Sequence, residues 1–548
     1  IHITEKSFGD KTLMKDVKFS VDDGEKVGVV GRNGVGKSTL FGILSGKDTD
    51  YTGEVIFRRG ITVATTAQEH HGLGDQTVMS YILGGLPEYS KLKKIIDEYP
   101  LTMGDNMRKI EEYTQALERF DQKGFYQVEE KLERELSNFQ LDGFGDRKIS
   151  SLSGGQKRLV EIVKIMHSEA HLALIDEPTN HMDYVAKQQF IDWMNSQPHQ
   201  AMLIITHDRD VLEQVDRIVE IKDGQAVSYR GNYDAYLKQN AQATTAGMNN
   251  FEQIEKRIVN LKQKVLDYQR LKEKSRNPGT IQKFKRLENE ARAELAELSE
   301  MEKPTFWIDK ESVGQLDYKS AERYGKFKSR NIRLSMKDAS SRSQHVLVRA
   351  ENVAVGIGER ILFEDVNIDL REGEAIEIRG RNGAGKTTLI RMILASGKSF
   401  DGGSVLYSGD IFLDPQVRIG VYEQEIDERY LSDPLEKAIE KLYMSRDLSI
   451  SDTKIRQLLA DYLFTDADRM TPLARLSGGQ KARFQIIAML ANDPQLLILD
   501  EPTNHLDLPS IEELETALVK YSGAILYVSH DNYFREKLGG KVVQIGAE

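Results

Sequence analysis

Two stretches of the sequence combine glycines, a lysine and a hydroxyl residue at the spacing of a phosphate-binding loop. Residues 31–38 read GRNGVGKS and residues 380–387 read GRNGAGKT. In the pattern G-x-x-x-x-G-K-[ST], the glycines let backbone N–H groups wrap phosphate oxygens, the lysine neutralises the β/γ charge, and the hydroxyl binds Mg²⁺. The sequence therefore predicts two sites for the phosphates of a nucleotide.

A pair of carboxylates and a histidine follow apolar strand signals in each half of the chain. A carboxylate at the end of a strand can hold the metal, and the glutamate after it is placed to orient or deprotonate the attacking water. His207 and His530, each in the dipeptide HD, can contact the γ-phosphate. A solvated strand end and a structural histidine are the ordinary alternatives, but the repetition of the pattern favours catalysis. The carboxylates are Asp176, Glu177, Asp500 and Glu501.

The elements that must position these residues also recur in the same order. SLSGGQKR at 151–158 recurs as RLSGGQKA at 475–482, and LIDEPTNHMD at 174–183 recurs as LILDEPTNHLD at 497–507. Strand signals such as KVGVVG and EAIEIRG precede the phosphate loops, and helical stretches separate them. We therefore expect a duplicated α/β domain, each copy with a largely parallel core.

The spacing between corresponding motifs indicates an insertion in the first copy. Gln68 and Gln424 are 356 residues apart, whereas Glu177 and Glu501 are only 324 apart. The first copy thus has 32 extra residues between Gln68 and its LSGGQ segment, in a charged helical region at approximately 86–140. We expect an inserted helical arm, whose simplest interpretation is a pair of solvated surface helices.

Composition narrows the class of protein. A chain of 548 residues with 39% hydrophobic content can bury two or three cores, and its net charge of -11 argues against a generally basic nucleic-acid coat. The absence of cysteine excludes disulfides and thiolate metal sites and fits a reducing compartment. No apolar run is long enough for a bilayer and no signal peptide opens the chain, so we expect a soluble, cytoplasmic protein. Because Ile1 already lies in a strand signal, we also expect a few preceding residues.

A basic helical hairpin is predicted between the two copies, around the turn Asn277-Pro278-Gly279. Residues 256–286 contain 11 Lys or Arg and 2 acids, whereas 288–302 contain six acids and one arginine. A cationic tip on an acidic protein suits phosphate backbones, although a solvated hairpin is the alternative. The apolar seam comprises Phe251, Ile254, Ile258, Leu261, Val265 and Tyr268, then Phe284, Leu287, Ala291, Leu295, Leu298 and Met301; the candidate RNA-binding residues are Lys272, Lys274, Arg276, Lys283, Lys285 and Arg286.

A second basic stretch follows the hairpin. Residues 318–337 contain seven cations and one acid, with Tyr324 and Phe327 between them. Two interpretations are open. The stretch can stack on or clamp RNA, or it can be a flexible tether to the second copy.

Outside its middle segment, nearly the whole chain resembles ATP-binding cassette ATPases. The resemblance rests on the two phosphate loops and on the LSGGQ signatures at 152–156 and 476–480. The resemblance implies ATP and Mg²⁺ as cofactors, and two nucleotides held head-to-tail between two cassettes of one chain, so that a monomer suffices. We expect a first cassette over 1–240 with the helical arm, a helical-hairpin linker over 241–345 and a second cassette over 346–548.

The resemblance also implies two composite sites, each completed by the signature of the opposite cassette. Glu177, Glu501, His207 and His530 would be catalytic, and Ser38, Gln68, Asp176, Thr387, Gln424 and Asp500 would hold the metal. Phe8 would stack on adenine, whereas its counterpart is Ile357, which predicts unequal sites. Nucleotide-binding residues are, in site one, Phe8, Gly31, Asn33, Gly34, Gly36, Lys37, Ser38, Thr39 and Gln68 with Ser477, Gly478, Gly479 and Gln480, and, in site two, Gly380, Asn382, Gly383, Gly385, Lys386, Thr387, Thr388 and Gln424 with Ser153, Gly154, Gly155 and Gln156.

Within the cassette ATPases the chain resembles the ABC-F family most closely. It has EPTNH in both copies, YRGNYDAYLKQ at 229–239 and an interdomain helical linker, and the linker argues against a separate transporter subunit. The resemblance implies that the ATP-closed protein binds the ribosome at the tRNA exit site, touches rRNA and peptidyl-site tRNA through the linker, and leaves on hydrolysis. A factor for translation regulation or rescue, a ribosome-protecting antibiotic-resistance protein and a non-ribosomal ATP-dependent clamp remain open; the short turn mildly favours the first.

Overall fold

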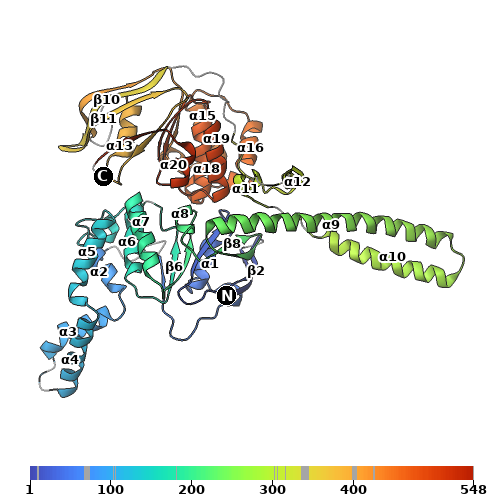
Figure 1. The fold of residues 1–548 in the computed structure, drawn as a ribbon, viewed down its shortest axis with the longest axis horizontal. Coiled ribbons are helices and arrows are strands. Elements are labelled where there is room, and N and C mark those ends of the chain that lie inside the picture. Colours follow the sequence, from blue (N-terminus) through green and yellow to red (C-terminus); the bar gives the residue numbers. More distant parts are fainter. Residues whose placement is uncertain are drawn as a thin grey trace. The chain divides into compact units, whose positions relative to one another are not determined.

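The described residues form two compact units (Figure 1). One unit consists of Ile1–Tyr233 and Ile332–Glu548, which we call the first and the second cassette, and the other consists of Asp234–Asn331. The computed structural model describes residues 1–8, 11–66, 75–102, 104, 106–180, 182–301, 303–304, 306–314, 316, 318–334, 345–397, 404–423 and 426–546.

The first cassette contains a six-stranded sheet in the order β5-β6-β7-β3-β8-β9. Neighbouring strands pair in parallel from β5 through β6, β7 and β3 to β8, and β8 and β9 pair antiparallel. The segments LALID and AMLII, which are short and apolar, form the central strands because a parallel sheet is covered on both faces. The strands are β3 Lys26–Gly31, β5 Val63–Thr65, β6 Leu172–Asp176, β7 Ala201–Ile205, β8 Arg217–Lys222 and β9 Gln225–Arg230, with β1 His2–Phe8, β2 Lys11–Lys18 and β4 Thr52–Glu54 in a second, antiparallel sheet.

The helices that carry the motifs begin where the motif residues dictate. Helix α1 (Lys37–Leu44) begins at the lysine of the phosphate loop, directly after β3. Helix α6 (Gly154–Met166) begins in the signature, where Ser153 and Gln156 form a reciprocal capping box. Asp183 caps helix α7 (Tyr184–Ser196), and α8 (Arg209–Leu212) follows the segment of His207. The phosphate loop and the signature therefore each coincide with the start of a helix.

A helical arm is present in the first cassette where the motif spacing predicts an insertion. Helices α3 (Tyr89–Thr102) and α4 (Met107–Gln122) form it, as Figure 1 shows. The rings of Tyr89, Phe120 and Phe125 cluster with centroids 5.2 to 5.7 Å apart, which anchors the arm. The adjoining elements are α2 Val78–Gly84, α5 Val128–Asn138 and two 3₁₀ turns, Phe125–Gln127 and Ile149–Ser151.

The second cassette repeats this architecture. Its parallel sheet has the order β14-β15-β16-β12-β17, and an antiparallel sheet has the order β11-β10-β13. The strands are β10 Val346–Ile357, β11 Arg360–Arg371, β12 Ala375–Arg379, β13 Ser404–Leu413, β14 Ile419–Tyr422, β15 Leu496–Asp500, β16 Ala524–Val528 and β17 Lys541–Gln544. The helices are α13 Lys386–Leu394, α14 Glu428–Leu431, α15 Leu435–Met444, α16 Asp452–Asp461, α17 Asp466–Arg469, α18 Gly478–Leu490, α19 Leu508–Lys520 and α20 Asn532–Leu538, with a 3₁₀ turn at Leu473–Arg475. The duplicated α/β fold is confirmed.

The expected helical hairpin is confirmed in the other unit. It consists of α9 (Tyr233–Lys274) and α10 (Pro278–Ser299). Leu261, Val265 and Ala291 are buried together in its seam, and the rings of Tyr268 and Phe284 stack with centroids 6.4 Å apart. The seam ends before Met301, which is half exposed. The helical spacing of apolar residues thus predicts the pairing over most of its length.

Asn277 forms the turn at the tip of the hairpin. Its side-chain oxygen accepts a hydrogen bond from the N–H of Gly279 at 2.9 Å. Pro278 occupies the first position of α10, where its missing N–H costs nothing and its fixed φ favours the helix. The three residues between the two helices therefore suffice to reverse the chain.

An apolar cluster at the other end of this unit changes the interpretation of the second basic stretch. Residues 318–327 form helix α12, and α11 covers Lys310–Gly314. Tyr324 and Phe327 are buried, Phe251 packs on Phe327, and the hydroxyl of Tyr324 accepts a hydrogen bond from the N–H of Ile308 at 2.9 Å. The interpretation that these two rings stack on RNA is wrong, because both are occupied inside the protein. A flexible tether is also wrong for 318–327, which is helical.

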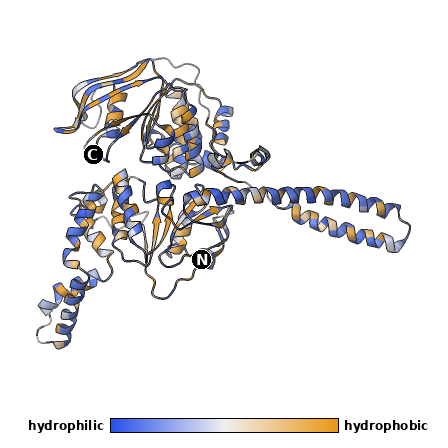
Figure 2. Cartoon of the chain, viewed as in Figure 1, coloured by the Kyte–Doolittle hydropathy of each residue, from blue (hydrophilic) through white to orange (hydrophobic). Residues whose placement is uncertain are grey.

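Hydropathy follows these elements closely. Figure 2 shows apolar residues concentrated on the interior strands of the cassettes, and helices α9 and α10 mainly hydrophilic with apolar residues along them. Among the helices that the structure describes, none combines the length and the apolar character needed to cross a membrane.

Candidate nucleotide-binding sites

The phosphate loops have a backbone that their glycines permit. Gly36 and Gly385 precede the lysines with φ of 103° and 97°. A Cβ at Gly36 would also lie 2.8 Å from the side chain of Leu13. Only glycine tolerates both the left-handed backbone and the crowding, so these positions explain part of the motif.

The lysine of each loop folds back over the loop. Lys37 Nζ donates to the carbonyls of Gly31 at 2.6 Å and Arg32 at 3.1 Å. Lys386 Nζ donates to the equivalent carbonyl of Gly380 at 2.8 Å. Burial lowers the pKa of both lysines, and neighbouring carboxylates oppose that shift. Each ammonium is thus held where phosphate oxygens would approach the loop.

A hydroxyl and a carboxylate meet in each site and fit a hard cation. Ser38 Oγ donates to Asp176 Oδ2 at 3.3 Å, and Thr387 Oγ1 donates to Asp500 Oδ2 at 2.7 Å. The other carboxylate oxygen of Asp500 is buried and has no hydrogen-bond partner among the described residues, and burial raises the pKa of Asp500 to about 6. Oxygen donors of this kind are the ligands that Mg²⁺ takes, and a cation would satisfy the unpaired oxygen. Gln68 and Gln424 lie outside the described residues.

The two candidate general bases have an unusual backbone. Glu177 and Glu501 have φ of 48° and 52°, a left-handed conformation that costs roughly 1–3 kcal/mol in a non-glycine residue. Each is held there by its own N–H, which donates to Ile205 O at 2.8 Å and to Val528 O at 3.0 Å, respectively. The neighbouring strand end therefore fixes the direction of each glutamate.

Burial prepares these glutamates to accept a proton. It raises the pKa of Glu177 to about 8 and holds the pKa of Glu501 above its usual value. His207 Nε2 lies 3.4 Å from Glu177 Oε1, and His530 Nε2 lies 3.3 Å from Glu501 Oε1. Burial lowers the pKa of both histidines to about 3, so each ring is neutral beside its carboxylate. A carboxylate with a raised pKa is a suitable general base near neutral pH.

The phosphate loop of the first cassette touches the second cassette. The N–H of Asn33 donates to Asp507 Oδ2 at 3.1 Å, and its side-chain Nδ2 donates to the carbonyl of His505 at 2.9 Å. Gly479 of the signature lies against the same side chain, since a Cβ there would be 2.0 Å from Asn33 Nδ2. The signature position therefore has no room for a side chain.

A cavity of about 520 Å³ brings the residues of site one together. It is lined by the phosphate loop and catalytic residues of the first cassette and by the signature of the second. The lining residues are Leu13, Asn33, Gly34, Gly36, Lys37, Ser38, Thr39, Arg158, Asp176, Glu177, Asn180, Ile205, His207, Ser477, Gly478, Gly479 and His505. The cavity therefore combines residues of both cassettes.

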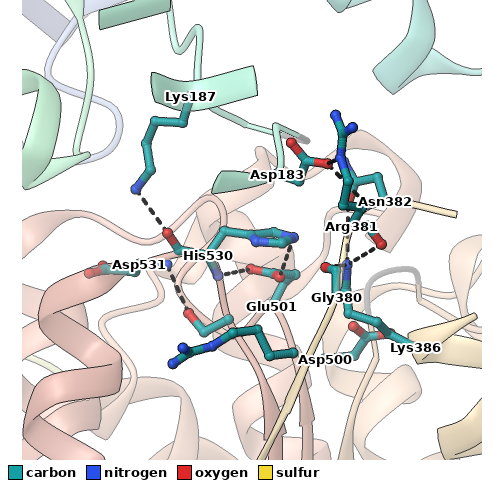
Figure 3. A network of polar contacts seen from close by, with 12 residues as sticks. Asp183, Lys187, Gly380, Arg381, Asn382, Lys386, Asp500, Glu501, His530 and Asp531 are labelled. Carbon is teal, nitrogen blue, oxygen red and sulfur yellow. Dashed lines mark hydrogen bonds and ion pairs between the residues drawn. The ribbon is translucent and has the colours of Figure 1, made fainter. Parts of the chain in front are cut away.

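Site two is joined across the cassettes by Asp183, as Figure 3 shows. Asp183 Oδ2 accepts hydrogen bonds from the N–H of Asn382 and from Arg381 Nε, each at 3.2 Å. Lys386, Asp500, Glu501 and His530 lie together in the second cassette. Within the described part of the chain, no hydrogen bond joins Ser153 or Gln156 of the first signature to this loop; those two residues cap each other.

The sequence interpretation left Asp183 and Asp507 without a role in the sites. One oxygen of each caps a helix, by accepting from the N–H of Ala186 at 2.9 Å and of Ser510 at 3.1 Å. The other oxygen reaches the phosphate loop of the opposite cassette. An aspartate at the same distance after Glu177 and Glu501 was the available signal, but its partner lies far away in the sequence.

Of the two positions expected to face adenine, the structure describes the side chain of only one. The side chain of Phe8 lies outside the described residues, and Ile357 is half exposed at the end of β10. The expected inequality in stacking therefore remains a prediction from the sequence.

The candidate RNA-binding residues divide into two groups. Lys272 Nζ pairs with Glu288 Oε2 at 2.6 Å, and Arg286 Nε pairs with Glu290 Oε1 at 2.9 Å. The remaining four residues are exposed, and the described residues show no ion pair for any of them. They are Lys274, Arg276, Lys283 and Lys285.

Known proteins share the fold and the motif-bearing segments of this chain. The family model described as ABC transporter matches residues 14–180 and 363–504. A solved structure of the archaeal ribosome recycling factor aABCE1, in complex with the ribosomal stalk protein aP1, aligns with a TM-score of 0.59 at 18% identity and covers 100% of this chain and 87% of that chain. The structural likeness concerns the fold.

Curated relatives match over almost the whole chain. The putative ATP-binding protein YdiF of Bacillus subtilis is 30% identical and covers 99% of this chain and 79% of its own length. ABC transporter F family member 2 of Arabidopsis thaliana is 29% identical over 98% of this chain and 75% of its own, and the energy-dependent translational throttle protein EttA of Mycobacterium tuberculosis is 28% identical over 97% and 88%. With its two cassettes and these relatives, the chain belongs to the ABC-F family of ATP-binding cassette ATPases.

Proposed function

We propose that this protein hydrolyses ATP in two composite sites, each made from the phosphate loop of one cassette and the signature of the other. The contact of Gly479 and His505 with Asn33, beside Glu177 and His207, carries this proposal. It brings a signature next to the catalytic side chains of the opposite cassette. Hydrolysis in such a site depends on closure, because neither cassette holds all the groups.

Within site one, the residues of the chain bind, orient and accept a proton. Lys37 and the N–H groups of its loop bind the phosphates, and Ser38 and Asp176 hold Mg²⁺, which when bound supplies positive charge beside the phosphates. Glu177 orients the attacking water and accepts its proton, and neutral His207 keeps the carboxylate in place. Lys386, Thr387, Asp500, Glu501 and His530 take the same roles in site two.

The proposed partner is the ribosome, bound near the tRNA exit site by the ATP-closed protein, with the hairpin tip on peptidyl-site tRNA and rRNA. The four exposed, unpaired cations at the tip suit phosphate backbones, and the relative EttA is named a translational throttle protein. Hydrolysis would permit release, which fits a role in translation regulation or rescue. This partner would place the protein in the cytoplasm.

Ribosome pelleting tests the partner directly. The variant Glu177→Gln with Glu501→Gln keeps the shape of both sites and loses both bases, so it should pellet with ribosomes in ATP and remain in the supernatant in ADP. Equal pelleting in the two nucleotides, or none in either, contradicts the proposal.

Charge removal at the hairpin tip tests the contact surface. Changing Lys274, Arg276, Lys283 and Lys285 to glutamine in the ATP-trapped variant should weaken ribosome binding and make its logarithmic salt slope shallower by up to about 3.6, since each phosphate contact contributes about 0.7–0.9. Lys272 is left unchanged because it pairs with buried Glu288.

A matched control removes four exposed cations from the stem of the same hairpin. It changes Lys256, Lys262, Lys264 and Arg270 to glutamine, all on α9. A much smaller loss than in the tip variant supports contact at the tip. Equal losses place the contact along the whole hairpin, and no loss in either variant means that these residues only solvate it.

A further inference from the structure

Lys187 is a buried cation that bridges the two cassettes. It lies on α7 of the first cassette and is only 4% exposed. Its Nζ lies 2.6 Å from Asp210 Oδ2, 3.2 Å from Asp208 Oδ2 and 2.8 Å from the carbonyl oxygen of His530. Three oxygens match the three donors of an ammonium. One of the three belongs to the second cassette, and Figure 3 shows Lys187 directed at it.

The partners of Lys187 are the segments that follow the two catalytic histidines. Asp208 directly follows His207 and Asp210 lies two residues further along, whereas the accepting carbonyl belongs to His530 itself. Asn532 adds a second bridge, since its Nδ2 donates to Asp210 Oδ2 at 2.7 Å. The two segments are therefore tied to each other by side chains.

The internal repeat shows that the second cassette has no lysine at the corresponding position. Lys187 is the fourth residue after Asp183, and the fourth residue after Asp507 is Ile511. Ile511 is buried in the apolar cluster of the second cassette and has no donor. The His207 segment is tied to α19 of the second cassette by a different contact, in which Arg209 Nη1 donates to Glu515 Oε1 at 2.8 Å.

The bridge reaches the catalytic glutamate of site two through one residue. The N–H of His530 donates to Glu501 Oε2 at 3.1 Å, and its ring lies beside Oε1. Lys187 holds the carbonyl of the same residue. A small cavity of about 70 Å³ is lined by Lys187, both catalytic glutamates and both histidines, among others. Lys187 thus lies between the two catalytic pairs.

We propose that Lys187 is a positioning residue that keeps His530 and Glu501 of site two aligned with the His207 segment of the first cassette, a role that Ile511 at the corresponding position cannot take for site one. This inference rests on the proposed function and deepens it by naming a residue that couples the two sites. A shift of the His207 segment moves the anchor of Lys187 and thereby the base of site two, whereas the second cassette holds the His207 segment through a different pair, Glu515 and Arg209.

Isolated sites test the assignment. Glu177→Gln leaves site two active, and Glu501→Gln leaves site one active. Adding Lys187→Met should lower kcat about tenfold or more in the first background, because a hydrogen bond to a charged group is worth about 1.5–3 kcal/mol. The KM for ATP should change less than about twofold, and kcat in the second background should fall less than about twofold, since neither binding at site two nor the base of site one uses this contact.

Two further variants keep the test interpretable. Lys187→Met leaves the partly buried Asp208 and Asp210 without their cation, so Lys187→Met with Asp210→Asn is measured as well and should show the same site-two loss with a melting temperature closer to wild type. Lys187→Arg keeps the charge and should restore part of kcat.

The outcomes separate the two proposals. An equal loss at both sites, or no loss at site two in an active background, overturns the role of Lys187. Absence of hydrolysis in the wild-type protein contradicts the proposed function itself. A loss confined to site two, with KM unchanged, supports both.

Discussion

The two ATP sites share their motif residues but differ in what the opposite cassette brings to them. At site one, Asn33 meets Gly479, His505 and Asp507. At site two, the equivalent loop gives both Arg381 and Asn382 to Asp183. The same motif residues therefore have different surroundings in the two sites, because each set is completed by a cassette that has its own sequence.

The difference is largest where the repeat replaces a charge with an apolar side chain. Lys187 pairs with two aspartates of its own cassette and donates to a carbonyl of the other cassette, whereas Ile511 packs among apolar side chains. Burying an ammonium is costly unless it is paired, so such a residue stays fixed by its partners. An isoleucine contributes packing without a preferred partner. The same fold position thus serves positioning on one side and core packing on the other.

Removing each catalytic base should give the largest effect and measure the share of each site. Glu177→Gln and Glu501→Gln should each lower turnover at their own site by about a hundredfold or more, since general base catalysis contributes 10²–10⁴-fold. The residual kcat of each single variant, with nucleotide binding as control, reports the other site. Equal residual rates would show that the two sites turn over equally, which contradicts the expected difference between them. Wild-type turnover in the double variant would refute both roles.

Neutralising the cross-cassette aspartates should give the next largest effect. Asparagine still caps a helix well, so Asp183→Asn and Asp507→Asn mainly remove charge from the cross-cassette contact. Asp183→Asn should weaken ATP-dependent closure at site two about tenfold, because Asp183 accepts from a guanidinium. Apparent ATP affinities measured with each site isolated check this, with Asp507→Asn as the corresponding variant of site one, and an unchanged affinity at site two would contradict it.

Adenine stacking should distinguish the sites more modestly. Aromatic stacking on a base is worth about 1–3 kcal/mol, so Phe8→Ala should weaken nucleotide binding at site one by about fivefold or more. Ile357→Ala should change site two less, because that side chain is half exposed and has no ring. Fluorescent-nucleotide titrations of the isolated sites test this, and equal losses would remove stacking from the comparison.

The smallest expected effect is a pH-dependent gain in stability. The folded pKa of Glu177, about 8, lies above its ordinary value of 4.5, so the native state binds more protons between these values and loses stability as pH rises from 4.5 to 8. Glu177→Gln removes this loss. Without nucleotide or Mg²⁺ it should melt at a higher temperature than wild type at pH 8 and at nearly the same temperature at pH 4.5.

Calorimetry at both pH values checks this prediction. The control is Glu54→Gln, which replaces an exposed glutamate on β4. A rise at pH 4.5 as large as that at pH 8 would contradict the assignment to titration of Glu177. Glu501→Gln should show the same direction, which compares burial in the two sites.

The RNA-stacking interpretation of the second basic stretch failed for a physical reason. The cations around Tyr324 and Phe327 suggest an RNA-stacking surface, yet both rings are buried against α9, where Phe251 meets Phe327. Cations and apolar rings alternate on any amphipathic helix that covers another part of the protein. The sequence shows that a helix has an apolar side, but it does not show whether a ligand or the protein itself covers that side.

By itself, the sequence determined the features that are local. Glycine spacing fixed the phosphate loops, apolar runs fixed the strands, and the 3-4 spacing from Leu261 to Tyr268 with the Asn277 turn fixed the hairpin, since each depends on residues a few positions apart. Only the tertiary structure decided which side chains meet between the cassettes. Asp183 with Arg381, and Lys187 with His530, lie far apart in the sequence, and the lysine of the second pair is replaced by Ile511 in the other repeat. Such contacts arise from how two folded surfaces pack, and no period or motif in the chain encodes them.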